Sequence, residues 1–394
     1  MDPKVKIALV IGTRPEAIKM APVYLTMKAD PWIDPCLIVS AQHREMLDDA
    51  LTIFDIAPDI DLDLMEPGQT LSDLAARLIV NVQSVLKDIK PDIVLVHGDT
   101  STCLFSAMAA FYEQIPIGHV EAGLRTYNYL APWPEEMNRR LTDQISDWCF
   151  APTPKAAENL HGENIPTSNI YITGNTGIDA FLLALQKIEN RPMEVNGLDP
   201  REIEGKRLIL VTGHRRESFG RPFEQFCLAL KDIAEVHSDI VIVYPVHLNP
   251  NVQKPVKRIL DNEKRIVLID PIAYLPFVQL MKRCEFIITD SGGIQEEAPS
   301  IHKPVLITRS TTERPEAMDA GMAQLVGTSR NEIVAAASQL LTDPERYRSM
   351  YAGVNPYGDG KASKRIVEIL TSQNSKRDGG LNLHDEQEDK SSRQ

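Results

Sequence analysis

Short apolar segments alternate with longer segments of helical periodicity along most of the chain. In the first half, the apolar segments predict strands at residues 5–11, 36–40, 92–96 and 116–119. The segments between them predict helices at residues 15–27, from about residue 45, at 71–89 and at 102–112. Strands that are apolar on both faces and alternate with helices are typical of a parallel sheet covered by helices on both sides.

The same alternation starts again after residues 191–206, a polar segment with proline and glycine that is typical of a linker. Beyond it, apolar segments predict strands at residues 207–211, 240–244, 266–269, 286–289 and 304–307. We therefore expect an α/β protein with two Rossmann-like, doubly wound domains at residues 1–190 and 207–371. The last helix of the second domain is expected to pack back on the first. Residues 372–394 are too polar to bury a core, which predicts a disordered tail.

The composition is that of a soluble globular protein, since 43% of the 394 residues are hydrophobic and 25% are charged. The net charge of −13 argues against nucleic acid and anionic membranes as partners. No apolar segment reaches the roughly 18 residues that span a membrane. A strand begins at residue 5, so we expect no signal peptide and a cytoplasmic location. The five cysteines form no C-x-x-C pair, which favours free thiols and argues against a metal site.

A glycine turn follows the predicted strand at 286–289, where ligands of doubly wound sheets bind. Ser291, Gly292 and Gly293 would expose backbone amides at the start of a helix, and such a turn favours a phosphate. Glu297 could accept hydrogen bonds from two neighbouring hydroxyls, as on a ribose, and the guanidinium of Arg314 suits a phosphate or a sugar. A tight turn beside a solvated carboxylate would give the same pattern.

Cations follow the first strand of each predicted domain. Arg14 and Lys19 lie near a predicted helix start, where two positive charges do not suit the helix dipole, and this hints at an anionic ligand. A pair that faces solvent is the alternative. His214 stands beside two arginines at a strand end, which favours contact with an anion.

Three carboxylates follow successive structural elements of the first predicted domain. Asp99 and Glu121 come after the strands at 92–96 and 116–119, and the proline-rich turn at 132–134 leads to Glu135 at a helix start. A carboxylate next to a buried strand is costly unless it is used or paired. The three could form an acid/base cluster, although Asp99 could also cap a helix.

Seven segments occur in a specific order: GTRPEAIKMAP, HGDTST, HVEAGLRT, PWPEEMNRRLTD, GHRRES, YPVHLNP and TDSGGIQEEAPS. Together they resemble the non-hydrolysing UDP-N-acetylglucosamine 2-epimerases, and the resemblance is continuous from about residue 5 to 370. It implies a GT-B-like fold in which two domains face a deep cleft. A homodimer is also expected.

The resemblance implies a role for each matching residue. Ser291, Gly292 and Gly293 would hold the pyrophosphate of the substrate, Glu297 would bind the ribose, and Phe277 would border the uracil. The acid/base groups would be Asp99, Glu121 and Glu135. The residues that would contact phosphates or stabilise departing UDP are Arg14, Lys19, His214 and Arg314.

Some relatives also bind a second UDP-sugar as an activator. Gln42, Arg215 and His247 are compatible with such an effector site. Glu45 and Gly68 stand where certain relatives carry glutamine and arginine, and these departures count against effector binding. Ile272 replaces a glutamine that lies near the base in some relatives, so only a backbone contact would survive there.

The implied reaction is the reversible epimerisation of UDP-N-acetylglucosamine at C2, without metal or nicotinamide. UDP is first eliminated to give 2-acetamidoglucal and is then added back, which yields UDP-N-acetylmannosamine for surface polysaccharide synthesis. A glycosyltransferase of the GT-B type would share the nucleotide site but would need an acceptor. A non-catalytic UDP-sugar sensor would keep the glycine turn and Glu297 but would not need three carboxylates.

Overall fold

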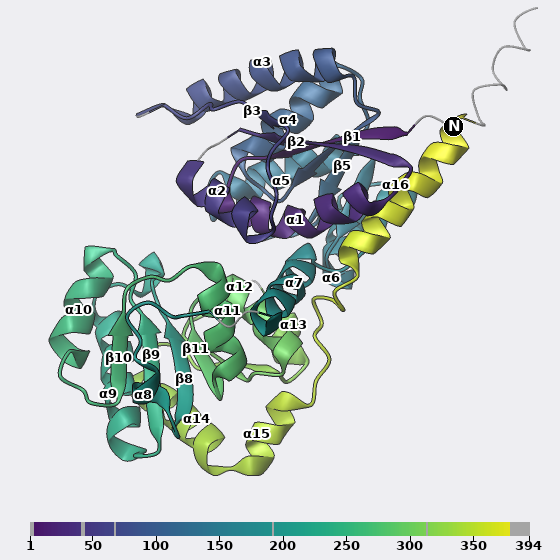
Figure 1. The fold of residues 1–394 in the computed structure, drawn as a ribbon. Helices are drawn as coiled ribbons and strands as arrows, with labels where there is room; N and C mark the ends of the chain where they lie inside the picture. Colours follow the sequence, from purple (N-terminus) through teal and green to yellow (C-terminus); the bar gives the residue numbers. More distant parts are fainter. Residues whose placement is uncertain (1–3, 41–43, 67, 191–192, 313, 379–394) are drawn as a thin grey trace, which may run out of the picture. The chain divides into compact units, whose positions relative to one another are not determined.

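The structure is a computed structural model that describes residues 4–40, 44–66, 68–190, 193–312 and 314–378 (Figure 1). The chain forms two compact units. Unit 1 consists of Met1–Asp179 together with Gly360–Gln394, and unit 2 is Ala180–Asp359.

Unit 1 contains a parallel sheet with the strand order β3-β2-β1-β4-β5-β6-β7. Its strands are β1 (Val5–Ile11), β2 (Ile33–Val39), β3 (Ile60–Asp61), β4 (Ile93–His97), β5 (Ile117–Val120), β6 (Trp148–Ala151) and β7 (Ile170–Ile172). Its helices are α1 (Arg14–Ala29), α2 (Arg44–Ile53), α3 (Leu71–Ile89), α4 (Ser101–Tyr112), α5 (Glu135–Gln144), α6 (Pro154–Gly162) and α16 (Ala362–Asp378), and α7 (Thr176–Asn190) begins in it.

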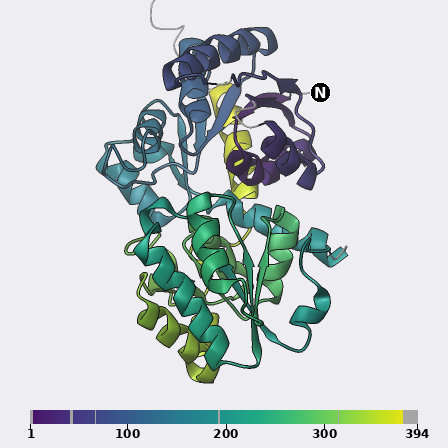
Figure 2. The same cartoon turned by 90° about the vertical axis from the view of Figure 1, so that its left-hand side faces the viewer.

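Unit 2 contains a second parallel sheet, with the order β10-β9-β8-β11-β12-β13. Its strands are β8 (Arg207–Thr212), β9 (Ile240–Pro245), β10 (Ile266–Ile269), β11 (Phe286–Thr289), β12 (Val305–Ile307) and β13 (Ala323–Leu325). Its helices are α8 (Pro200–Ile203), α9 (Arg221–Val236), α10 (Pro250–Leu260), α11 (Tyr274–Arg283), α12 (Gly292–Glu297), α13 (Glu316–Asp319), α14 (Arg330–Thr342) and α15 (Pro344–Tyr351). Figure 2 shows helices on both sides of this sheet.

The predicted doubly wound α/β fold is confirmed, and the reason lies in the strand composition. Central strands such as β4 and β11 are buried at every position, as expected for parallel strands covered by helices on both faces. The strand order reverses between β1 and β4 in unit 1 and between β8 and β11 in unit 2. Ligands of such sheets bind outside the carboxyl ends of the strands at these reversal points. Within the described residues, no helix has the length and apolar character needed to cross a membrane.

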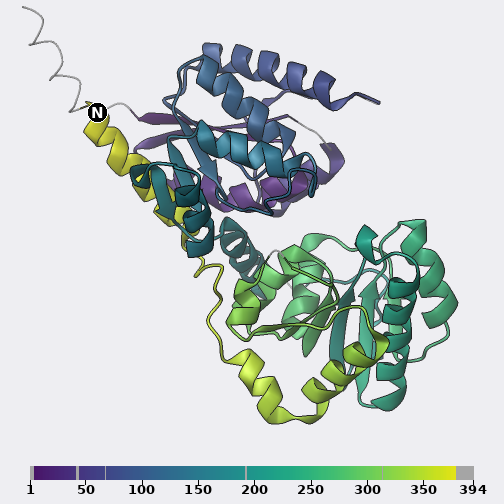
Figure 3. The same ribbon diagram turned by 180° about the vertical axis from the view of Figure 1, so that it is seen from behind.

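The division of the chain differs from the contiguous domains expected at 1–190 and 207–371. Unit 1 ends at Asp179 inside α7 and resumes at Gly360, because α16 packs against α1 (Figures 1 and 3). The carboxylate of Asp179 accepts hydrogen bonds from the backbone amides of Ala362 and Ser363, at 3.2 and 2.8 Å. These bonds tie the start of α16 to unit 1.

Two further differences concern segments without a strong apolar pattern. The predicted linker at 191–206 contains the short helix α8, and the predicted tail from residue 372 begins inside α16. The last part of that tail, 379–394, lies outside the described residues. No strand is predicted from the sequence at the positions of β3, β6, β7 and β13, which are two to four residues long.

Candidate functional site

The loops after β1 and β4 are joined by one buried carboxylate, that of Glu16. Its Oε2 accepts hydrogen bonds from Gly12 N, Thr13 N and Thr13 Oγ1 at 2.9, 2.7 and 2.8 Å, and its Oε1 accepts one from Thr100 Oγ1 at 2.6 Å. Burial raises the pKa of Glu16 despite these bonds. Sequence reasoning missed Glu16, although Thr13 and Glu16 have the spacing of a capping box. Arg14, the first residue of α1, is half-buried.

Glu121 lies directly after β5 and is held in an unusual conformation. Its φ of 68° is in the left-handed region, and its Oε2 accepts a hydrogen bond from the Lys19 ammonium. The Nε2 of His97 lies 3.6 Å from the same oxygen, just beyond a hydrogen bond. Burial alone would raise the pKa of Glu121, but Lys19 and His97 outweigh it and hold that pKa well below its usual value. The structure therefore brings the predicted residues Lys19 and Glu121 together.

Asp99 follows β4 and is held from the side of α5. Arg139 donates a hydrogen bond to the Asp99 carboxylate, and Asn138 Nδ2 donates one to the Asp99 backbone oxygen at 2.9 Å. Glu135 is the first residue of α5, and its Oε2 is buried without a hydrogen-bond partner among the described residues. Helix α5 thus carries Glu135, and through Arg139 and Asn138 it also positions Asp99.

A buried charge network supports the two loops that carry Asp99 and Glu121. His119 Nδ1 lies 2.6 Å from Asp143 Oδ1, and His119 Nε2 donates to the backbone oxygen of Gly98 at 2.7 Å. Arg125 Nη2 donates to Asp143 Oδ2 at 2.6 Å and to Glu163 Oε2 at 2.8 Å. Burial opposes ionisation of Asp143, but His119 and Arg125 lower its pKa below the usual value. The network fixes Gly98, the residue before Asp99.

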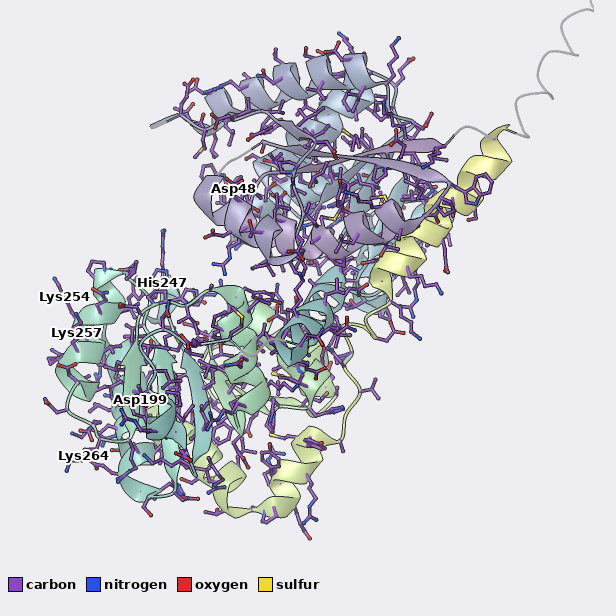
Figure 4. The ribbon with its side chains drawn as sticks, in the orientation of Figure 1. Asp48, Asp199, His247, Lys254, Lys257 and Lys264 are labelled. Carbon is purple, nitrogen blue, oxygen red and sulfur yellow. The ribbon has the colours of Figure 1, made fainter. Side chains whose placement is uncertain are left out.

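In unit 2, hydrogen bonds connect the loop after β8 to Asp290, the residue that follows β11. Asp290 Oδ2 accepts hydrogen bonds from the backbone amides of His214 and Arg215 at 2.7 and 2.8 Å. The imidazole of His214 stacks on that of His247, with ring centroids 5.2 Å apart and an interplanar angle of 11°. Burial lowers the pKa of His214 more than the nearby Asp290 raises it. His247, which follows β9, is labelled in Figure 4. Gln42 lies outside the described residues.

The guanidinium of Arg314 lies on the glycine turn after β11. A Cβ atom added to Gly292 would stand 2.6 Å from Arg314 Nη1, so no side chain fits at Gly292 unless the guanidinium moves. Arg314 Nε donates a hydrogen bond to Glu296 Oε1 at 2.6 Å. The structure thus groups Arg314 with Gly292 in the predicted turn, and Glu296 is a neighbour that sequence reasoning missed.

Glu297 is the last residue of α12, one residue beyond Glu296. The hydroxyl of Tyr274 donates a hydrogen bond to Glu297 Oε1 at 3.0 Å. Phe277 lies three residues after Tyr274 on α11 and is half-buried. No three His, Cys, Asp or Glu side chains in the described part of the chain are placed to hold a metal ion.

The sequence profile described as UDP-N-acetylglucosamine 2-epimerase matches residues 25–371. The UDP-N-acetylglucosamine 2-epimerase of Escherichia coli K12 is 53% identical over 368 residues, which cover 93% of this chain and 98% of that protein. This chain belongs to the UDP-N-acetylglucosamine 2-epimerase family. The resemblance seen in the motifs and the expected isomerase class are confirmed.

Solved structures of relatives agree with this assignment. The epimerase from Neisseria meningitidis, bound to UDP-GlcNAc, has a TM-score of 0.84 and 46% identity, and the match covers 93% of this chain and 100% of that one. The epimerase from Methanocaldococcus jannaschii, in complex with UDP-GlcNAc and UDP, has a TM-score of 0.75 and 33% identity, with the same coverage of both chains. The family fold therefore extends over the two units described above.

Proposed function

We propose that this chain interconverts UDP-N-acetylglucosamine and UDP-N-acetylmannosamine by eliminating UDP and adding it back. The observation that carries the proposal is the placement of three carboxylates, Asp99, Glu121 and Glu135, after β4, after β5 and at the start of α5. Two of them are held by cations from neighbouring elements, Lys19 and Arg139. Relatives solved with UDP-GlcNAc and UDP support the choice of substrate.

Unit 2 would bind the UDP part of the substrate. In the turn formed by Ser291, Gly292 and Gly293, the backbone amides of the two glycines would face the pyrophosphate, since the Ser291 amide donates to Thr289 Oγ1 at 2.9 Å. The adjacent Arg314 offers a planar cation that suits a phosphate. His214, which stands after the neighbouring strand β8, would help to stabilise departing UDP. These groups favour the C1–O bond cleavage because they stabilise the charge that develops on the leaving diphosphate.

Unit 1 would supply the acid and the base. The C2 proton of the sugar is not next to a carbonyl in the ring, so direct deprotonation is unfavourable. Departure of UDP gives C1 oxocarbenium character, which acidifies C2–H. A carboxylate then takes the proton, and the C2–H electron pair becomes the C1–C2 double bond of 2-acetamidoglucal. Protonation of C2 from the opposite face and return of UDP to C1 give the epimer.

The test is proton NMR of UDP-N-acetylglucosamine with the enzyme in D₂O, without metal, nicotinamide or a sugar acceptor. We expect the manno epimer to form with deuterium at C2, and long incubations to release UDP and 2-acetamidoglucal. A glycosyltransferase would leave C2–H intact, and a sensor would leave both bonds intact. Epimer without deuterium at C2 would contradict proton exchange with solvent, and no epimer at all would contradict the proposed function.

A second prediction concerns the turn that would hold the pyrophosphate. Gly292→Ala should leave the fold stable, because the Arg314 side chain that meets the new Cβ is flexible and can move. Moving the guanidinium should raise the Kd for UDP by about tenfold or more, since hydrogen bonds to charged groups are typically worth roughly 1.5–3 kcal/mol. Calorimetry with UDP measures this change. Gly162→Ala is the control, because a Cβ at Gly162 meets nothing within 4 Å.

A second UDP-sugar site also stays a proposal. Arg215 and His247 lie next to His214, whose imidazole stacks on that of His247. The homodimer, the cytoplasmic location and the supply of a surface polysaccharide pathway remain predictions from the sequence.

A further inference from the structure

The hydrogen bond between Tyr274 and Glu297 joins two helices of unit 2 that are separated in sequence. Tyr274 is the first residue of α11, and Glu297 is the last residue of α12. The tyrosine is 8% exposed, so its ring is packed inside the unit while its hydroxyl reaches Glu297 Oε1 at 3.0 Å. A phenol hydroxyl donates here to a carboxylate, and at 3.0 Å the bond lies at the long end of the O–H···O range.

The physical effect of this bond is on the rotation of the carboxylate. The terminal torsion of a glutamate side chain is broad, so a carboxylate that is not held can rotate with little cost. A hydrogen bond to one oxygen selects the rotation in which that oxygen faces the donor. A carboxylate whose plane already faces two adjacent hydroxyls loses less rotational freedom when it binds them, and pre-organisation of this kind improves affinity.

The first turn of α11 connects this bond to the proposed uracil contact. Residues three apart on a helix are neighbours on one face, and Tyr274 and Phe277 have this spacing. Phe277 is half-buried, in contrast to the buried Tyr274. One turn of helix therefore supplies the aromatic residue expected at the base and the hydroxyl that orients the carboxylate expected at the ribose.

We propose that Tyr274 is a positioning residue that makes the nucleotide site selective for ribose over 2′-deoxyribose, acting through Glu297. This inference rests on the proposed function, because it requires Glu297 to bind the ribose hydroxyls of UDP. Tyr274 itself does not have to touch the nucleotide.

The experiment compares the Kd values of UDP and 2′-deoxy-UDP for the wild-type chain and for Tyr274→Phe by calorimetry. The wild type should prefer UDP, because 2′-deoxy-UDP lacks one hydroxyl for Glu297. Tyr274→Phe keeps the ring and removes only the hydroxyl. We expect it to weaken UDP binding by about two- to tenfold, the size of the cost of ordering one side chain on binding, and to leave 2′-deoxy-UDP binding much less changed.

Two variants show whether Tyr274 acts through Glu297. In a double-mutant cycle, Tyr274→Phe should change the UDP preference little once Glu297→Gln is present, because residues that act together are not additive. Tyr347→Phe is the matched control, since Tyr347 also donates through its hydroxyl, to the backbone oxygen of Glu285 at 2.9 Å. It should leave the ratio of the two Kd values unchanged.

Each outcome has a defined meaning. A ratio of Kd values that falls toward one in Tyr274→Phe supports the proposal. An equal loss for both nucleotides would show a merely structural role at the start of α11, and an unchanged ratio would show that Glu297 needs no support; either result overturns the proposal. A wild type that binds both nucleotides equally would remove Glu297 from the ribose site, and a wild type that binds neither would contradict the proposed function itself.

Discussion

Glu121→Gln should lower the turnover number for UDP-N-acetylglucosamine by about 10²- to 10⁴-fold, the usual loss when a general acid or base is removed. Glutamine keeps the shape of the side chain but cannot take a proton from C2. It also leaves the Lys19 ammonium without the carboxylate that accepts its hydrogen bond. Because the groups proposed to bind the diphosphate are the glycine turn and Arg314, and Glu121 is not among them, the Kd for UDP should change much less than the turnover number.

The measurement is the initial rate of epimer formation by NMR, with calorimetry for UDP on the same preparation. Glu158→Gln is the matched control, since Glu158 is an exposed carboxylate of unit 1 paired with Lys155 on α6. It should epimerise at the wild-type rate. Wild-type turnover in Glu121→Gln would take Glu121 out of the acid/base set and leave Asp99 and Glu135 as its members.

Asp143→Ala should lower the free energy of unfolding by about 3–5 kcal/mol, the typical cost of breaking a buried ion pair by removing one partner. The Asp143 carboxylate lies against His119 and Arg125, and none of the three side chains is exposed to solvent. Its removal leaves a buried guanidinium with only the Glu163 carboxylate as an anionic partner of the network. Urea denaturation measures the change, and Glu158→Ala should alter the free energy little because Glu158 is exposed.

The same variant should change how stability depends on pH. Asp143 has a lower pKa in the folded protein than the usual value of about 4 in an unfolded chain. Its stabilising contribution is therefore present above about pH 4 and is lost as the pH falls through the lower, folded pKa. Asp143→Ala should be less sensitive to pH in this acidic range than the wild type. An equally steep loss of stability in both would contradict the lowered pKa.

Much of the fold could be predicted because it depends on local patterns. Strands such as β4 and β11 are largely apolar and buried at every position, and this character identifies a parallel sheet. The division into units could not be predicted in the same way. The return of the last helix to the first domain is expected from the sequence. Its partner α1 and the boundaries at Asp179 and Gly360 depend on contacts between distant segments, and no hydrophobic pattern states these.

In the candidate site, too, residues with a local pattern could be predicted, and residues that depend on partners distant in sequence could not. The glycine turn could be singled out from sequence because it follows a predicted strand at the edge where ligands of doubly wound sheets bind, and Arg314 because its planar cation suits a phosphate. His97, His119 and Asp143 could not be, because a buried polar side chain is explained by its spatial partners. Asp143 meets His119 across 24 positions of sequence. The left-handed φ of Glu121 likewise has no signal in the residue type.

The position of α16 in unit 1 has a consequence for the synthesis of the chain. Ile366 and Leu370 of α16 are fully buried, so the core of unit 1 is incomplete until they emerge from the ribosome. Residues 180–359 emerge before them and contain all of unit 2. Because domains generally fold as units during translation, unit 2 can close while unit 1 still waits for its last helix. The unit that begins first is therefore the unit that is finished last.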